Sequence, residues 1–361
     1  MKSYSFSGKH VLVTGASGGL GSAMVRDLAD MGARMVVTSR SMKALNELIS
    51  TLPEGTRAVP LTADLSRQGD AETLARQAIE ALGHIDVLFN NAGIGYFALM
   101  EEASEESIRH LFELNTFSPL ILIKTLMPRM KSGGGGRIIN IVSAAGRVPI
   151  PTVGVYGGSK SALAVMTNTM RLELAPAGID IINIYPGTVA TSFEENALRE
   201  EERPGLCPRE SCGLPRFDMA EKVLAAASGP PGEVWLEWQG KWMAIAALAW
   251  PGLVEGRLAP VRDRAVKTKT FKKRRWRLLQ VESSIACNLR CVMCPWREIA
   301  KDTENKGLMT QEVWEAVRPY LKDVRSVDFT GGGEPLLQTR LTDWLTEANS
   351  CLLYTSPSPR D

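Results

Sequence analysis

The chain has 361 residues, of which 44% are hydrophobic, and its formal net charge is +2 at neutral pH. This length suits two domains, and the small net charge excludes the strong global field that would attract nucleic acid or an acidic partner. The apolar run Met243–Trp250 is far shorter than the roughly 20 residues of a membrane span, and we find no signal-peptide core, so the sequence predicts a cytoplasmic protein.

Short apolar runs alternate with helix-period segments from Lys9 to about Val189, which predicts a parallel sheet covered by helices. Amphipathic segments such as Leu20–Met31 and Ser41–Leu52 predict the intervening helices. Residues Phe193–Pro215 predict a mobile loop that shapes the substrate pocket, and MAEKVLAAA predicts a helix after it. The predicted strands are HVLVTG, RMVVTSR, RAVPLTADL, IDVLFNNAG, GRIINIVS and IDIINIYPG.

The segment TGASGGLG, Thr14–Gly21, lies between the first predicted strand and the first helix. Gly15, Gly19 and Gly21 remove side chains where a backbone must approach a pyrophosphate, and the helix N-terminus offers N–H groups to it. A glycine-rich turn is weak evidence by itself, but this one lies where a nucleotide-binding fold requires it.

The segment YGGSK places Tyr156 and Lys160 on one face of a helix. A nearby ammonium stabilises a phenolate and so lowers the pKa of the tyrosine. Ser143, at the end of a predicted strand, is placed to hydrogen-bond a substrate oxygen beside that phenol. A Tyr-x-x-x-Lys pair alone would more often be an ordinary surface pair, so the interpretation depends on the other motifs.

These motifs, with NNAG at Asn90–Gly93, Asn115 and PGTVAT at Pro186–Thr191, occur in the order of one family. Residues 1–264 resemble the short-chain dehydrogenase/reductase family. The resemblance implies an α/β, Rossmann-type, doubly wound parallel sheet and an NAD(P)-dependent oxidoreductase. Such an enzyme interconverts a carbonyl and an alcohol in a small-molecule substrate and forms a homodimer or homotetramer.

The resemblance also implies roles for the matching residues. Tyr156 is the general acid/base, and Lys160 binds the nicotinamide ribose and lowers the pKa of Tyr156. Ser143 polarises the substrate carbonyl, and Asn115 supports a water-mediated proton relay to Lys160. The implied cofactor contacts, besides Tyr156 and Lys160, are Thr14, Gly15, Ser17, Gly19, Leu20, Gly21, Asp64, Leu65, Asn91, Ala92, Gly93, Pro186, Gly187, Val189 and Thr191.

The end of the second predicted strand indicates the choice of cofactor. NAD-binding proteins place an acidic residue there to accept hydrogen bonds from the ribose hydroxyls. This strand ends in VVTSRS, with Ser39 and Arg40 and no carboxylate. Because a guanidinium matches a 2′-phosphate in charge and geometry, the sequence favours NADP over NAD.

Residues 261–277 include the basic run KTKTFKKRRWR. We interpret 265–277 as a solvated linker rather than a nucleic-acid or lipid site. The short apolar helix upstream leaves peripheral membrane contact open as an alternative. A second strand–helix pattern begins after the linker and extends over 278–350.

CNLRCVMC places Cys287, Cys291 and Cys294 at a spacing typical of an iron–sulfur site. A zinc site would need a fourth ligand, and the last histidine of the chain is His110. With TGGGEP at Thr330–Pro335, the motif resembles the start of a radical S-adenosylmethionine enzyme. The resemblance implies a [4Fe–4S] cluster on the three thiolates, S-adenosylmethionine on its open iron, and Glu334 at the amino group of that cofactor.

The second resemblance covers about two βα units of a (β/α) barrel, so 278–350 is predicted to be a truncated fragment fused to the dehydrogenase. Residues 351–361, CLLYTSPSPRD, show no period and back-translate to a string similar to a transposon-based sequencing adapter, which predicts read-through. Two alternatives stay open: radical chemistry as the main activity, and a non-catalytic nucleotide-sensing module, against which the intact Ser143, Tyr156 and Lys160 argue.

Overall fold

The computed structural model describes residues 3–187, 189–190, 193, 195–200, 214–267, 276–281, 283–284, 307–329 and 335–351. The chain divides into two compact units, Met1–Thr268 and Lys269–Asp361. Within the described ranges, no helix combines the length and the apolar character needed to cross a bilayer.

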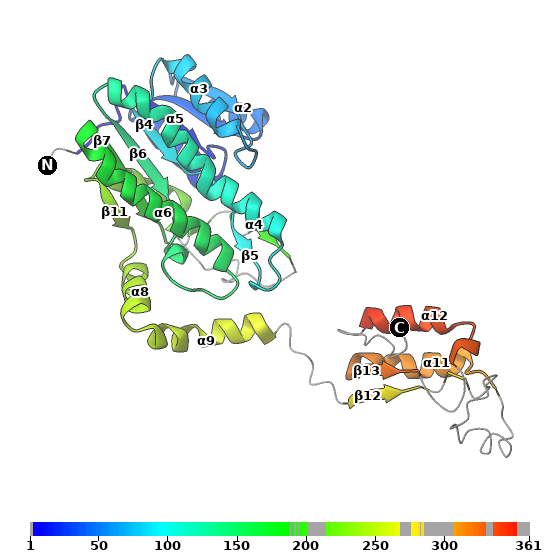
Figure 1. Ribbon diagram of the computed structural model, residues 1–361. Coiled ribbons are helices and arrows are strands. Elements are labelled where there is room, and N and C mark those ends of the chain that lie inside the picture. Colours follow the sequence, from blue (N-terminus) through cyan, green and yellow to red (C-terminus); the bar gives the residue numbers. More distant parts are fainter. Residues whose placement is uncertain are drawn as a thin grey trace. The chain divides into compact units, whose positions relative to one another are not determined.

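A seven-stranded sheet forms the centre of the first unit (Figure 1). Its strand order is β3-β2-β1-β4-β6-β7-β11, and every neighbouring pair is parallel. The chain therefore runs outward from β1 to one edge and then from β4 to the other edge, the doubly wound arrangement. The strands are β1 His10–Thr14, β2 Arg34–Ser39, β3 Ala58–Thr62, β4 Val87–Asn90, β6 Gly136–Ile141, β7 Ile179–Tyr185 and β11 Gly232–Trp235.

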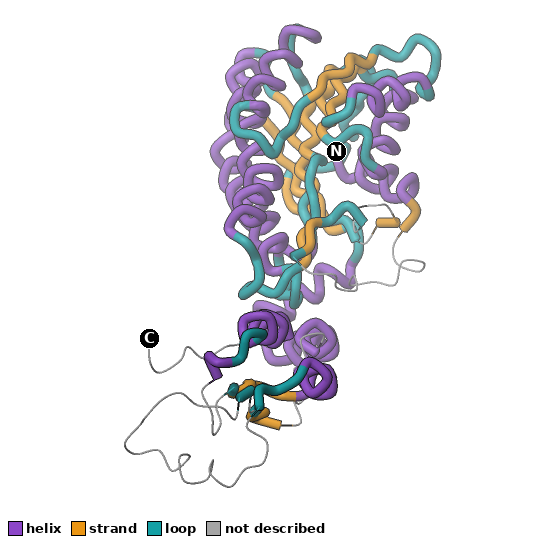
Figure 2. Tube along the Cα trace, turned by 90° about the vertical axis from the view of Figure 1, so that its right-hand side faces the viewer, coloured by secondary structure: helices purple, strands orange, loops and turns teal. Residues whose placement is uncertain are grey.

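Helices cover both faces of this sheet (Figure 2). Val11 and Val13 of β1 pack on one face with α1, α2 and α7, whereas Leu12 packs on the other face with α3 and α5. Buried side chains on both faces explain why the strands read as continuous apolar runs. The helices of this unit are α1 Gly19–Asp30, α2 Met42–Ser50, α3 Asp70–Leu82, α4 Glu105–Phe112, α5 Ser118–Ser132, α6 Gly154–Leu174, α7 Arg216–Ala227, α8 Trp238–Ala249 and α9 Pro251–Lys267.

Short elements complete the first unit. A π-helical turn, η1 Glu113–Phe117, joins α4 to α5, and 3₁₀ turns occupy η2 Ala144–Gly146 and η3 Ala175–Ala177. The segment expected to be a mobile loop contributes described strands: β9 Leu198–Arg199 pairs with β5 Tyr96–Phe97, and β10 Leu214–Pro215 pairs with β8 Val189–Ala190. Strand β11 and helix α9 were not predicted, and α9 extends to Lys267, inside the expected linker.

The second unit has a parallel pair of strands, β12 Trp276–Gln280 and β13 Val324–Asp328. Its core includes Trp314 and Trp344, whose rings stack with centroids 5.3 Å apart. The remaining described elements are α11 Gln311–Val317, η4 Arg318–Asp323, η5 Pro335–Leu337 and α12 Leu341–Cys351.

Candidate active site

The predicted site residues gather at the carboxyl ends of β1, β4, β6 and β7, where the direction of winding changes. Strand β1 leads into α1 on one face, and β4 leads towards α5 on the other. Thr14 ends β1, and its hydroxyl donates to the Phe89 carbonyl oxygen at 3.1 Å and accepts from the Asn91 and Ala92 amides, each at 3.0 Å. The two central loops are therefore held together by one buried hydroxyl.

Gly15 and Gly21 permit a close approach between these loops. Gly15 has φ +65°, and a Cβ there would lie 2.9 Å from the Cα of Ala92. A Cβ on Gly21 would overlap the Gly15 carbonyl oxygen and lie 2.9 Å from Nδ2 of Asn91, which itself donates to the Thr14 carbonyl oxygen at 2.9 Å. Larger side chains at either glycine would push the loops apart.

The N-terminus of α1 is open to an anion. Its cap residue, Gly18, makes no side-chain hydrogen bond to the first turn, and that turn contains no acidic residue. The N–H groups of a first helical turn have no partner within the helix, and the helix dipole adds partial positive charge. Ser17 is exposed on this turn, and Gly19 and Leu20 are half-buried.

The residues that follow β2 and β3 lie close enough to interact. Arg40 is exposed, and its charge helps to lower the pKa of Asp64, although the hydrogen bond from Ser66 to that carboxylate is the larger cause. Ser66 donates its hydroxyl to Asp64 Oδ1 at 2.6 Å. Among the described residues, no carboxylate lies within ion-pair distance of Arg40, which leaves its guanidinium for a ligand. Leu65 is buried.

Ser143, Tyr156 and Lys160 meet beyond the ends of β6 and β7. Ser143 follows β6, and Tyr156 and Lys160 lie in the first two turns of α6. Burial raises the pKa of Tyr156 to about 12, opposed by a hydrogen bond from Ser143. Burial also lowers the pKa of Lys160 to about 8, and its Nζ donates to the Ile141 carbonyl oxygen at 2.9 Å. The sequence predicted a tyrosine pKa lowered by the lysine, whereas here burial dominates.

Asn115 lies in the π-helical turn η1 and is fully buried. Its side chain accepts from the Ile94 amide at 3.1 Å and donates to the Ile94 carbonyl oxygen at 3.0 Å. A Cβ on Gly93 would lie 3.1 Å from both Asn115 Oδ1 and Lys160 Nζ, so glycine lets these two polar groups converge. Turns of this kind inside α-helices often occur at functional sites.

Two contacts at this site were not predicted from the sequence. The Glu237 carboxylate occupies the space that a Cβ on Gly187 would need. The ring of Phe193 packs edge-on against Tyr156, with centroids 5.9 Å apart. Neither neighbour carries a local motif, so only the folded chain reveals them.

The other predicted site residues divide into described and undescribed positions. Pro186 and Gly187 follow β7, and Val189 begins β8; all three are half-buried. Thr191, Cys287, Cys291, Cys294 and Glu334 lie outside the described residues.

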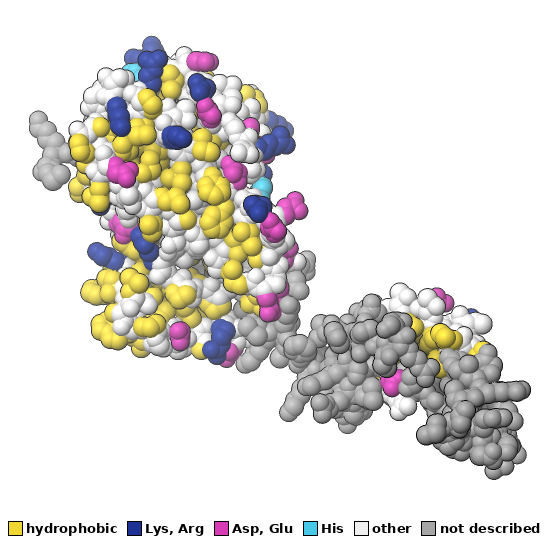
Figure 3. Space-filling model, viewed as in Figure 1, with side chains coloured by type: hydrophobic (Ala, Val, Ile, Leu, Met, Phe, Trp, Pro, Cys, Tyr) yellow, Lys and Arg dark blue, Asp and Glu magenta, His cyan; other side chains and the backbone are white. Residues whose placement is uncertain are grey.

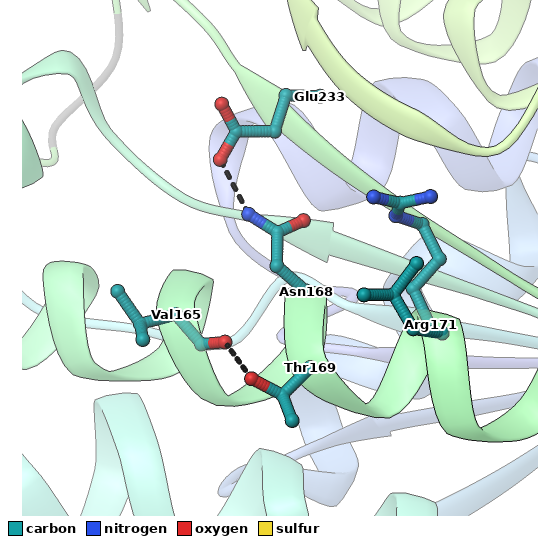
Figure 4. A pocket seen from close by; sticks show the side chains of 6 residues that line it. Val165, Asn168, Thr169, Arg171 and Glu233 are labelled. Atoms are coloured by element: carbon teal, nitrogen blue, oxygen red, sulfur yellow. Dashed lines mark hydrogen bonds between the residues drawn. The ribbon is translucent and has the colours of Figure 1, made fainter.

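A separate surface hollow of about 470 Å³ lies on α6 and β11 (Figure 4). Asn168 donates to the Glu233 carboxylate at 2.6 Å across it, and Thr169 donates to the Val165 carbonyl oxygen at 3.2 Å. None of its lining residues is a predicted site residue, so this hollow is not the site built by the motifs.

Among the described residues, one group of three metal-ligand side chains has ligand atoms within 4.8 Å of one another: His10, His84 and Asp86. Asp86 Oδ2 accepts from the backbone amide of His10 at 2.8 Å, so it already holds the start of β1. The group lies at the amino ends of β1 and β4, away from the predicted site.

Comparisons with known proteins agree with the fold of the first unit. A family model described as short chain dehydrogenase matches residues 9–202. An uncharacterised oxidoreductase of Methylorubrum extorquens is 38% identical over 192 residues, which make up 53% of this chain and 77% of that protein. A short chain dehydrogenase from Burkholderia cenocepacia, solved with NADP, has a TM-score of 0.59 and 28% identity, covering 70% of this chain and 98% of that one. A short chain dehydrogenase/reductase from Burkholderia phymatum, solved with NAD, has a TM-score of 0.59 and 25% identity, covering 72% and 98%.

Proposed function

Because the chain belongs to the short-chain dehydrogenase family of oxidoreductases, we propose that it interconverts a small carbonyl compound and its alcohol with NADP as cofactor. The convergence of Ser143, Tyr156 and Lys160 beside the glycine turn carries this proposal. A purely nucleotide-sensing module would have no need for a serine bonded to a half-buried tyrosine.

The described residues fit a dinucleotide. The uncapped N-terminus of α1 suits the pyrophosphate, and the close approach at Gly15 and Gly21 leaves room for backbone contact with it. Arg40, without a carboxylate partner among the described residues, suits a 2′-phosphate. Both NADP and NAD occur in the similar solved structures, so the preference for NADP rests on Arg40.

The pKa values favour the reducing direction. With a pKa of about 12, Tyr156 is protonated at neutral pH and its hydroxyl can give a proton to a carbonyl oxygen. The cofactor, when bound, supplies the hydride that the carbonyl carbon accepts. Ser143 donates a hydrogen bond that orients the same oxygen, and Lys160, mostly charged below pH 8, stabilises the phenolate that remains. Two hydrogen bonds between the Asn115 side chain and the Ile94 backbone hold the loop that lies next to Lys160.

We expect Tyr156→Phe to abolish NADPH-dependent carbonyl reduction, by a factor of about 100 or more, because it removes the proton donor. Nucleotide affinity should stay near that of the parent, since the glycine turn and Arg40 are unchanged. Turnover is followed by NADPH absorbance across a panel of carbonyl compounds, and affinity by calorimetry. Phe193→Leu, beside the same ring, is the control for packing. Near-parent turnover in Tyr156→Phe would show that the assignment is wrong.

We expect NADPH to bind at least about tenfold more tightly than NADH, or about 1.4 kcal/mol, through Arg40. Arg40→Ala should remove most of this preference and leave NADH affinity nearly unchanged. Calorimetric titration of both nucleotides measures it, with Arg67→Ala, an arginine ion-paired to Asp64, as the matched control. Equal affinities in the parent protein would refute the role of Arg40.

Exposed apolar side chains on α6, together with Phe117 of η1, support assembly into a homodimer or homotetramer. Phe117 lies just before α5, and Val165, Met166 and Leu172 lie along α6, all exposed in the single chain. Several exposed large apolar side chains on one helix are commonly covered by another subunit.

For the second unit we propose a fragment of a radical S-adenosylmethionine domain. Strands β12 and β13 are parallel neighbours, with α11 between them in the chain. In the sequence, the cysteine motif comes after β12 and TGGGEP comes just after β13. Iron uptake by the three cysteines tests this assignment, and radical chemistry as the chain's main activity remains the alternative to carbonyl reduction.

A further inference from the structure

Helix α8 and the start of α9 expose a continuous set of large apolar side chains, which we call the α8–α9 face. Hydrophobic side chains gather over this part of the first unit in Figure 3. The exposed fractions are 70% for Trp238, 62% for Trp242, 39% for Ile245, 85% for Leu248, 64% for Trp250 and 67% for Leu253.

This exposure follows from how little of α8 is used in packing. Ala244 is the one residue of α8 that is buried, and it joins Val148 and Val254 in a small cluster beside Trp235. The helix is apolar around most of its circumference, so anchoring one side leaves the other apolar side in solvent. Three exposed tryptophans within thirteen residues, from Trp238 to Trp250, exceed the scattered apolar residues of an ordinary surface.

The chain that continues from α9 carries a concentrated positive charge. Helix α9 ends at Lys267, and seven of the eleven residues from Lys267 to Arg277 are lysine or arginine, with no acidic residue among them. A strongly basic run therefore follows, in the sequence, the two helices that carry the aromatic and aliphatic side chains of the α8–α9 face.

We propose that the α8–α9 face docks on the surface of an anionic lipid bilayer. Tryptophan favours the boundary between head groups and acyl chains, and leucine and isoleucine favour the acyl region just below it. Each basic residue near such a surface adds attraction to anionic head groups. With twelve residues, α8 extends about 18 Å, which suits a helix lying in the interface.

Two other occupants fit these observations less well. Single-stranded nucleic acid would use the tryptophans and the basic segment, but it has no use for Leu248 and Leu253, which are among the most exposed side chains of the face. A second copy of the chain would bring a second, identical basic run, whose charge adds to the first instead of neutralising it. A lipid surface satisfies both the aliphatic side chains and the charge.

The test is sedimentation of the full chain with sucrose-loaded vesicles of phosphatidylcholine, with and without phosphatidylglycerol. We expect binding to the anionic vesicles, weaker binding at high salt, and a blue shift of tryptophan fluorescence.

Trp242→Ser/Leu248→Ser/Leu253→Ser should lower the affinity by about tenfold or more. Because these side chains are exposed, the variant should fold, and circular dichroism checks this. Met31→Ser/Met42→Ser, at exposed positions beside α1 and α2 and outside the proposed subunit contact, is the matched control and should bind like the parent.

Replacing Lys272, Lys273, Arg274 and Arg275 with serine should weaken binding to anionic vesicles specifically. The proposal is overturned if the parent does not bind either vesicle, or if the triple variant binds as well as the parent. Two further results would overturn it. The triple substitution could change only the oligomeric state, from dimer to monomer in light scattering, or it could lower only the affinity for single-stranded DNA. Carbonyl reduction is not part of this assay, so its outcome is independent of the proposed catalytic function.

Discussion

Lys160 holds a charge where water is excluded. It is almost completely buried, and the hydrogen bond from its ammonium group to the Ile141 carbonyl oxygen only partly replaces hydration. Burial therefore lowers its pKa from 10.5 to about 8. A folded chain that keeps such a lysine in its interior gives up stability for it, which is common at active sites.

This burial predicts a dependence of stability on pH. Between pH 8 and 10.5 the unfolded chain keeps the Lys160 proton and the folded chain has lost it, so the free energy of unfolding rises with pH across this window. Relative to Lys160→Met, the parent should gain stability with a slope of up to about 1.4 kcal/mol per pH unit. Urea unfolding at several pH values measures the difference, and Lys124→Met, at an exposed position, should show no such slope. A parallel profile for parent and Lys160→Met would contradict the buried charge.

Strands β4, β6 and β7 are joined by a ladder of buried asparagines. Asn90, Asn140 and Asn183 are register partners on adjacent strands. Asn90 Nδ2 donates to Asn140 Oδ1, and Asn140 Nδ2 donates to Asn183 Oδ1, each at 2.9 Å. Thr167 of α6 donates to Asn183 Oδ1 at 3.0 Å. The ladder therefore ties α6, which carries Tyr156 and Lys160, to the strands that end at the site.

Removing the side chain of Asn140, the middle residue of this ladder, should lower the free energy of unfolding. Asn140→Ala leaves the Asn90 amide without its acceptor and Asn183 Oδ1 without one of its donors, both buried, so we expect a loss of about 2 kcal/mol in the free energy of unfolding. Denaturant titration measures it. Asn46→Ala, on the exposed surface of α2, is the matched control and should change stability by less than about 0.5 kcal/mol. A similar small change in Asn140→Ala would show that the ladder contributes little.

Six of the seven sheet strands could be predicted because they are apolar runs; five of them are largely buried, and β3, at the sheet edge, is half-buried. Strand β11 escaped prediction because it is short, contains Glu233 and lies at the sheet edge. Helix α9 escaped because Pro251, Gly252, Gly256 and Pro260 predict interruption, yet packing of Val254 against α8 holds the helix.

The residues of the candidate site also divide into those that could be predicted from the sequence and those that could not. Residues within local motifs, such as Gly15 and Tyr156, could be predicted from their order along the chain. Glu237 beside Gly187 could not be, because that contact depends on how α8 returns to the sheet after β11. The direction of the Tyr156 pKa also depends on burial, which the spacing to Lys160 does not report.

The two units have separate hydrophobic cores. The large clusters on the two sheet faces contain residues between Phe6 and Ala227, whereas the cluster around Trp314 and Trp344 contains residues between Val281 and Ala348. In the described part of the chain, no core cluster includes residues of both units. Each unit therefore buries its own apolar surface, which is the property of an independently folding domain.

This separation predicts that the two proposed chemistries can be assigned to different parts of the chain. Residues 1–268, produced alone, should keep carbonyl reduction within about twofold of the full chain, because every described site residue and its supporting core belong to this unit.

After anaerobic treatment with iron and sulfide, the full chain should take up about four irons, whereas 1–268 should take up none. Cys287→Ser/Cys291→Ser/Cys294→Ser in the full chain is the matched control: it should lose the iron and its absorbance and keep the reductase activity. Iron retained by this variant would mean that the cysteines are not the ligands, and loss of reduction in 1–268 would mean that the dehydrogenase site depends on the second unit.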